Sequence, residues 1–218
     1  MAKTRGLPAV LVSALVVIAA AQVARADELA GAALVEALRA GGYTIYVRHA
    51  ATDWGQHDRV AAAGDWTSCE PSEMRQLSAE GREAARRLGA AIRALAIPVA
   101  KVLSSEYCRA VETARLMDLG PVATTREIMN TRAAEYVGGL EAAIRRARRV
   151  LATRPAEGAN TVIVGHGNLM RAATGAYPEE GGSGVFAADP DAPHGFVLVA
   201  LLSADDWLRL AERFARDG

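Results

Sequence analysis

Hydrophobic positions along the chain follow two periods that alternate from start to end. Residues 78–96 place apolar side chains at helical spacing, with arginines on the opposite face, and this predicts an amphipathic helix. The other predicted helices are 28–40, 106–117, 137–152, 168–174 and a last one that Ser203 caps. Short runs rich in β-branched residues predict strands at 43–47, 99–103, 161–164 and 196–202.

Alternation of strands and helices is typical of one α/β domain. We therefore predict three layers, with a mostly parallel sheet covered by helices on both faces. Residues 50–76 have no clear period and predict a long loop, which in a compact domain usually serves function. The Gly- and Pro-rich stretch from Glu179 to Asp191 also predicts a loop.

The first 26 residues differ from the rest of the chain. Two basic residues precede an apolar run, which ends in Ala24-Arg25-Ala26. This pattern is typical of an export signal, so we predict a signal peptide over 1–26, a catalytic domain over 27–218 and a periplasmic or secreted protein. After cleavage we expect no stable membrane insertion. The alternative is a retained anchor, because the apolar run approaches spanning length.

Charge and cysteine content narrow the classes of partner. The chain has 25 basic and 25 acidic residues, so no overall field would attract nucleic acid. The arginine run over 145–149 falls on a predicted helix without interleaved aromatic residues, and we interpret it as a solvated face. The two cysteines, Cys69 and Cys108, form either a disulfide or two separate thiols.

Candidate chemistry gathers where predicted strands end. Arg48 and His49 end the first strand, Arg109 lies one turn into the helix after the second, and His166 follows a later strand. Carboxyl ends of parallel strands meet at one edge of a sheet, where ligands bind. Guanidinium groups fit phosphate oxygens, and an imidazole can attack phosphorus. These arginines and histidines, gathered at one edge of the sheet, predict an enzyme that transfers phosphoryl groups.

Three motifs resemble those of the histidine phosphatase, or phosphoglycerate mutase-like, superfamily. Arg48-His49-Ala50 resembles its R-H-G signature, the stretch from Ser104 to Ala114 its second signature, and Val164 to Gly167 its third. Their order and spacing also agree, and the resemblance covers about residues 43 to 202. One such motif alone would be weak evidence, whereas three at strand ends are strong.

The resemblance implies a phosphoglycerate mutase-like fold and a role for each matching residue. His49 would be the nucleophile that forms a phosphohistidine, and Arg48, Arg109 and His166 would bind the phosphoryl group. Since the family's phosphatases need no metal, we expect no cofactor.

Two features depart from the family pattern. Ala50 stands in place of the usual glycine, which a negative φ would permit. Thr131 and Gly167 occupy the positions where the two branches of the family carry an acid. The proton donor must therefore come from elsewhere. The main candidates are Glu180, in a flexible stretch that could close as a lid, and Asp53 on the first loop.

Other residues carry weaker signals. Glu135 and Glu179 are further possible acids. Arg126 and Arg132 could bind a second anionic group of the substrate or lie on the plain surface. Trp54 and Trp66 could stack on a substrate or anchor the loop.

Two alternatives concern single side chains. Asp53, His57 and Asp58 could form a metal site, although their loose spacing favours a polar loop. Ser104 and Ser105 are expected to cap the helix that carries Arg109.

Together these features predict a metal-independent phosphomonoester hydrolase that acts on a small phosphorylated substrate. A phosphate-binding periplasmic protein with weak turnover is the first alternative, because the proton donor is unclear. A phosphomutase is the second, and the missing acid and the export signal disfavour it. The sequence leaves the oligomeric state open.

Overall fold

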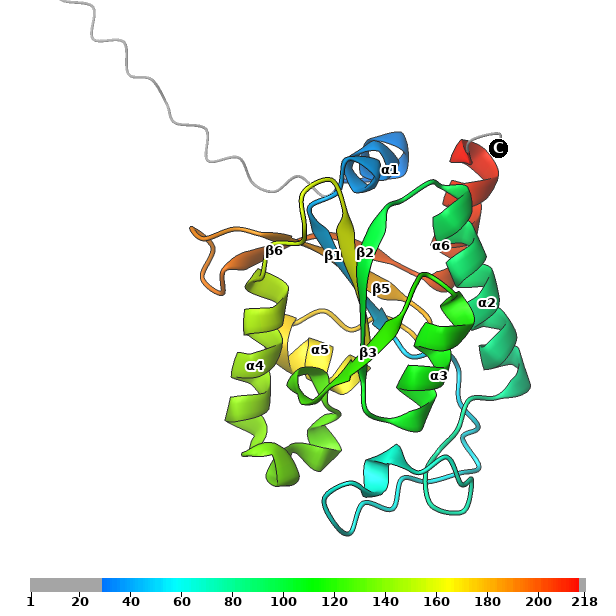
Figure 1. Ribbon diagram of the computed structural model, residues 1–218, viewed down its shortest axis with the longest axis vertical. Coiled ribbons are helices and arrows are strands. Elements are labelled where there is room, and N and C mark those ends of the chain that lie inside the picture. The colour runs from blue at the N-terminus through cyan, green and yellow to red at the C-terminus, as the bar shows by residue number, and fades with distance from the viewer. Residues whose placement is uncertain (1–28, 216–218) are drawn as a thin grey trace, which may run out of the picture.

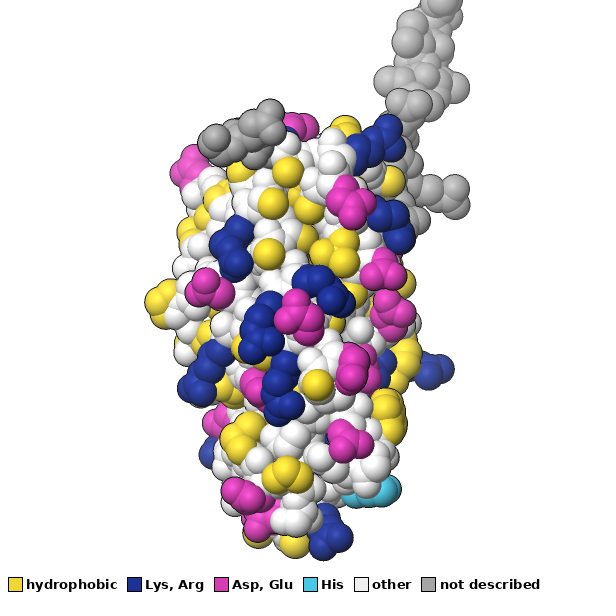
Figure 2. All heavy atoms as spheres, turned by 90° about the vertical axis from the view of Figure 1, so that its right-hand side faces the viewer, with side chains coloured by type: hydrophobic (Ala, Val, Ile, Leu, Met, Phe, Trp, Pro, Cys, Tyr) yellow, Lys and Arg dark blue, Asp and Glu magenta, His cyan; other side chains and the backbone are white. Residues whose placement is uncertain are grey.

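The computed structural model describes residues 29–215. The predicted signal peptide, residues 1–26, lies outside the described residues. Within them, no helix has both the length and the apolar character needed to cross a bilayer. On the face seen in Figure 2, basic and acidic side chains are intermixed rather than gathered by sign.

A six-stranded sheet forms the centre of the fold (Figure 1). Its order is β3-β2-β4-β1-β5-β6, and neighbouring strands from β3 to β1 are parallel. Strand β5 runs antiparallel to both of its neighbours. The strands are β1 (Tyr43–Arg48), β2 (Val99–Ser105), β3 (Val122–Thr125), β4 (Asn160–Gly165), β5 (Ser183–Ala188) and β6 (Phe196–Leu202).

Helices cover the sheet on both faces. The α-helices are α1 (Gly31–Ala40), α2 (Ala79–Ala94), α3 (Cys108–Met117), α4 (Leu140–Ala152), α5 (Gly167–Thr174) and α6 (Ala204–Phe214), with short 3₁₀ segments at Asp65–Thr67, Arg126–Ile128 and Thr131–Val137. Alternate β1 residues face opposite layers, since Ile45 and Val47 pack in the core with α1, α2, α3 and α6. Tyr46 packs in the second core, with α4 and α5. The predicted three-layer, mostly parallel architecture is confirmed.

Helix boundaries follow local capping chemistry. The Ser78 hydroxyl accepts a hydrogen bond from the Gly81 amide and begins α2. Ser203 and Asp206 form a capping box that begins α6, as the sequence predicted for Ser203. The predicted helix over 137–152 is shorter, because α4 begins only at Leu140 after the left-handed Gly138.

The predicted loop from Glu179 to Asp191 is partly wrong, because Ser183–Ala188 forms β5 between β1 and β6. The small residues that suggested a loop serve close packing here. A Cβ on Gly184 would lie 2.4 Å from the Met170 side chain. Strand β3 was not predicted, since it has four residues, none of them fully buried.

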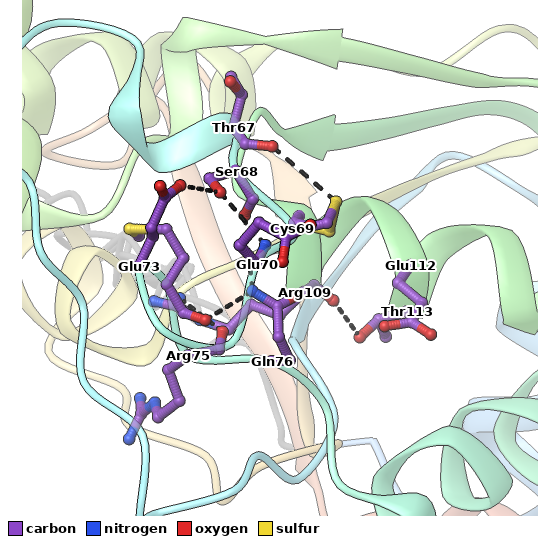
Figure 3. The surroundings of a disulfide bond; sticks show 12 residues. Thr67, Ser68, Cys69, Glu70, Glu73, Arg75, Gln76, Arg109, Glu112 and Thr113 are labelled. Atoms are coloured by element: carbon purple, nitrogen blue, oxygen red, sulfur yellow. Dashed lines mark hydrogen bonds between the residues drawn. A yellow bond between two sulfur atoms is a disulfide. The ribbon is translucent and has the colours of Figure 1, made fainter.

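Cys69 and Cys108 form a disulfide, which resolves the alternative that the sequence left open. It joins the long loop to the first residue of α3, next to Arg109 (Figure 3). The bond closes a loop of 39 residues. It thereby fixes the loop against the helix that carries a predicted site residue.

Replacing both cysteines with serine is expected to lower the free energy of unfolding by about 2–4 kcal/mol, because the unfolded chain gains loop freedom. Chemical denaturation of the oxidised chain and of the double variant measures this. An unchanged midpoint would contradict a structural role for the bond.

Candidate active site

The ends of β1 and β4 bring two histidines together at one edge of the sheet. Arg48 and Gly165 are paired in the parallel register, so His49 and His166 lie one residue beyond this pair. Their ring centroids are 5.4 Å apart. The expectation that separate strands deliver these residues to one edge is confirmed by this geometry.

A cavity of about 190 Å³ opens at this edge. It is lined by Arg48, His49, Trp54, Asp58, Arg75, Asn130, Arg132, His166, Gly167, Asn168 and Tyr177. A larger hollow of about 820 Å³ lies beside the disulfide and contains neither histidine. The smaller cavity is therefore the candidate site, because it holds the reactive groups.

His49 is held in one orientation by two contacts. Its Nδ1 lies 3.0 Å from the Ala50 carbonyl oxygen, which can only accept, so Nδ1 carries the proton. Its Nε2 accepts from Arg109 Nε at 3.3 Å. Burial, and then the positive charge of Arg109, hold the pKa of His49 well below its ordinary value. The ring is therefore neutral near pH 7, with its lone pair on Nε2.

Arg109 is buried beside His49 and paired with a carboxylate. Its Nη1 and Nη2 donate to the two oxygens of Asp58 at 2.8 and 3.0 Å. The side chains of Arg109 and Asp58 are 1% and 2% exposed. Two parallel bonds of this kind fix the plane of the guanidinium and direct Nε toward His49.

His166 has one partnered and one unpartnered ring nitrogen. Its Nε2 lies 2.9 Å from the Ser105 hydroxyl. Its Nδ1 is buried and has no partner within the described residues. A buried, unpartnered nitrogen of this kind at a cavity wall is suited to form a hydrogen bond with a bound ligand.

Ser104 and Ser105 do not cap α3, so that prediction is wrong. Both are buried at the end of β2, and Tyr107 is the N-cap residue, without a side-chain cap bond. Ser105 instead orients His166. It ends β2, which is a parallel neighbour of β4, and His166 follows β4 directly.

Arg48 reaches the cavity from the last position of β1. Its Nη1 donates to the Pro178 carbonyl at 3.1 Å, and its guanidinium carbon lies 5.1 Å from the centre of the Tyr177 ring. A Cβ on Gly167 would lie 2.9 Å from Arg48 Cδ. A glycine after His166 is therefore needed for Arg48 to pass.

Comparison with protein-family models matches residues 44–148 to the histidine phosphatase superfamily, branch 1. This range contains the first two motifs, and the buried His49–His166 pair adds the third. The chain belongs to the histidine phosphatase superfamily. The predicted enzyme class, a phosphatase, is thereby confirmed.

Solved structures that resemble this histidine phosphatase have low sequence identity to it. A mycobacterial glucosyl-3-phosphoglycerate phosphatase has a TM-score of 0.54 at 16% identity, over 75% of this chain and 100% of its own. The product of an open reading frame of Mycobacterium tuberculosis has a TM-score of 0.52 at 16% identity, over 75% of this chain and 98% of its own. A proposed α-ribazole-5'-P phosphatase from Escherichia coli has a TM-score of 0.50 at 19% identity, over 75% of this chain and 97% of its own.

At these identities the similarities show the fold, and they confirm that it is phosphoglycerate mutase-like. The comparison with curated protein sequences gave no match.

Ala50 fits this histidine phosphatase without strain. Its φ is not positive, and its methyl group is buried against Leu77 and Ala85. Its amide donates to the Thr113 hydroxyl at 3.1 Å. The methyl group thus belongs to a small apolar cluster beneath the nucleophile.

Glu180 lies beside Arg48, not on a free lid. Its carboxylate accepts from the Thr52 hydroxyl at 2.9 Å and lies 3.6 Å from Arg48 Nη2. The next residue, Gly181, donates its amide to the carbonyls of Arg48 and His49. The predicted flexible lid is therefore replaced by a segment pinned to the site, which leads directly into β5.

Asp53 is exposed, and its carboxylate bonds within its own loop. It accepts from the Gly55 amide at 2.8 Å and from Gln56 Nε2 at 3.0 Å. It does not line the cavity. Glu180 does not line the cavity either, but of the two main candidate acids it is the one that pairs with a residue of the cavity wall, Arg48.

The remaining predicted residues divide between the cavity and the surface. Arg132 and Trp54 line the cavity. Arg126 instead pairs with Glu106 at 3.0 Å. Trp66 is buried and donates to the same carboxylate, so Trp66 anchors the loop. Glu112, on α3, pairs with Arg82 near the surface and does not reach the cavity lining.

The alternative metal site on the first loop gains no support. Among the described residues no group of three or more His, Cys, Asp or Glu side chains could hold a metal ion. Asp58 instead pairs with Arg109.

Sequence reasoning missed Arg75 as a site residue and misassigned Asp58. Both lie in the long loop, whose length alone marked it as functional. Neither stands in a motif, so only their position in three dimensions reveals them.

Proposed function

We propose that this histidine phosphatase hydrolyses small phosphomonoesters through a phosphohistidine on His49, without a metal. The observation that supports this most is the neutral His49, whose Nε2 accepts a hydrogen bond from Arg109. His49 lines a cavity together with Arg48 and His166. A neutral imidazole with a fixed tautomer is a competent nucleophile.

In the first step, His49 Nε2 gives up its hydrogen bond from Arg109 Nε and attacks phosphorus, and the bond to the ester oxygen breaks. The leaving oxygen takes a proton from an acid, and the ring retains its Nδ1 proton. The Ala50 carbonyl stabilises the positive charge that the ring acquires. Arg48 and His166 Nδ1 bind the phosphoryl oxygens as the charge shifts.

In the second step, water attacks phosphorus and the P–N bond breaks. The electron pair returns to His49 Nε2, inorganic phosphate leaves, and the acid of the first step regains its proton from the attacking water. The enzyme is then restored with no group consumed.

Glu180 is the acid that we propose for these proton transfers. Its 3.6 Å contact with Arg48 supports this choice, and the Thr52 hydroxyl orients its carboxylate. Glu180→Gln is expected to reduce turnover of an alkyl phosphate by about 10²-fold, because such a leaving group needs a proton. Turnover of p-nitrophenyl phosphate should fall much less.

Asp53→Asn is the matched control, since Asp53 is an exposed carboxylate that bonds only within its loop. It should leave both substrates unaffected. Equal losses for both substrates in Glu180→Gln would contradict an acid role and indicate a structural one.

Hydrolysis of p-nitrophenyl phosphate by the purified domain, with and without EDTA, tests the proposed function. We expect turnover that EDTA does not reduce and that vanadate inhibits. Phosphate binding without turnover of any ester would favour the binding-protein alternative. Loss of activity in EDTA, restored by a divalent ion, would overturn the metal-independent mechanism.

We also propose that the protein works outside the cytoplasm. The signal pattern over 1–26 supports this, and so does the Cys69–Cys108 bond, since disulfides persist in oxidising compartments. Amino-terminal sequencing of the protein from its native host should give Asp27 as the first residue. A start at Met1 would favour the retained anchor.

A further inference from the structure

Arg75 presents a positive charge to the cavity, and the carboxylates of Asp58 and Glu180 act on this charge only from beyond ion-pair distance. Its side chain lines the cavity, and its Nε is buried without a partner. Within the described residues its guanidinium makes no ion pair within 4 Å. Its guanidinium stacks on the Trp54 ring, whose centre lies 4.2 Å from the guanidinium carbon. Stacking of this kind leaves the N–H groups at the edge of the guanidinium free to donate.

Arg109 has its donors already engaged. Its Nη1 and Nη2 bind Asp58, and its Nε faces His49 Nε2. It is also 1% exposed and does not itself line the cavity. Its guanidinium therefore serves the nucleophile, and few of its N–H groups are free for an incoming phosphoryl group.

Asp58 connects the two arginines. Its Oδ1 accepts from the Arg75 amide at 3.1 Å, while it binds the Arg109 guanidinium. Arg109 Nη1 also donates to the Arg75 carbonyl at 3.3 Å. The backbone of Arg75 is thus fixed on both sides, and Figure 3 shows its side chain pointing away from the disulfide.

Arg75 lines the same cavity as both histidines. Its charge contributes to lowering the pKa of His49 and of His166, after the larger effects of burial and of Arg109. Arg132 also lines the cavity, but its charge is not among the largest causes of either shift. Both arginines line the cavity, and Arg75 is the one whose Nε is buried there without a partner among the described residues.

We propose that Arg75 binds the phosphoryl group that His49 attacks. It supplies donors to the phosphoryl oxygens where Arg109 cannot, because the Arg109 Nη1 and Nη2 groups bind Asp58. This inference rests on the proposed function. It assigns Arg109 to orienting the nucleophile and pairs Arg75 with Arg48 as the two guanidinium groups that bind the phosphoryl oxygens. The loop over 50–76 then supplies a substrate-binding residue and not only a cover.

The test is binding of inorganic phosphate and vanadate to the domain, measured by calorimetry, beside kcat and KM for p-nitrophenyl phosphate. Arg75→Gln is expected to weaken phosphate binding at least tenfold and to lower kcat/KM by about 10²-fold, as loss of one charge-assisted donor does. Arg75→Lys should recover part of both, since it keeps the charge but not the planar fork.

Two further variants separate this role from others. Arg87→Gln, on the exposed face of α2, is the matched control for lost surface charge and should change neither value. Arg132→Gln should weaken phosphate binding less than threefold. Phosphate binding that is unchanged in Arg75→Gln would overturn the proposal.

Failure of the proposed function gives a different result. A wild-type domain that binds phosphate but hydrolyses no ester, with binding lost in Arg75→Gln, would reject hydrolysis and still support Arg75 as a phosphoryl ligand. A wild-type domain that does not bind phosphate would overturn both.

Discussion

The variant His49→Asn is expected to lose at least about 10⁴-fold in kcat for p-nitrophenyl phosphate, as removal of a catalytic nucleophile does in enzymes. The asparagine amide can still donate to the Ala50 carbonyl, as His49 Nδ1 does. It has no atom at the position of Nε2, however, so no phosphoryl intermediate can form. The loss should therefore appear in the chemical step while the protein stays folded.

Steady-state kinetics and phosphate binding on one preparation separate chemistry from binding. Phosphate should still bind His49→Asn, because Arg48 and His166 remain. His57→Asn, on the loop that follows His49 and outside the cavity lining, is the control and should keep full activity. If His49→Asn kept more than a tenth of the activity, another group would have to be the nucleophile.

The second large effect is expected from the buried pair of Asp58 and Arg109. Removing one partner leaves the other charged and buried, which costs about 3–5 kcal/mol in free energy of unfolding. Asp58→Asn and Arg109→Gln should each lose this much, and each should lower kcat/KM by about 10²-fold or more, because Arg109 no longer orients His49.

A double-mutant cycle tests whether the pair acts as a unit. The double variant should be less destabilised than the sum of the single variants, since neither charge is then left alone. The control is Arg82 and Glu112, a similar pair at 39% and 30% exposure, where the loss should be about 0–1 kcal/mol. Strict additivity at Asp58 and Arg109 would contradict direct coupling.

The sequence predicts the fold and the centre of the site for one physical reason. Parallel strands end at the same edge, so a residue that follows a strand can be placed before any coordinates exist. His49 and His166 follow β1 and β4, which are neighbours in the sheet. The same rule places Arg48, because it is the last residue of β1. It also places Arg109, because this residue lies in the first turn of α3, the helix that follows β2.

The rest of the site depends on the long loop over 50–76, whose apolar residues have no period from which a structure could be predicted. Asp58 and Arg75 are 17 residues apart, and the contacts that join them to Arg109 arise only on folding. The sequence around Glu180 predicts a flexible stretch, but Gly184 and its small neighbours form β5, and the Gly181 amide binds the Arg48 and His49 carbonyls. Small residues signal close packing as readily as a loop, and sequence alone does not separate the two.

The central claim is that phosphorus is bonded to His49 during turnover. Rapid acid-free quenching of the wild-type domain with ³²P-labelled substrate, followed by peptide mapping, measures this directly. The account predicts label on the peptide that contains His49, stable to alkali, labile to acid and missing from His49→Asn. Full turnover with no label on His49, or with label on another residue, would contradict it.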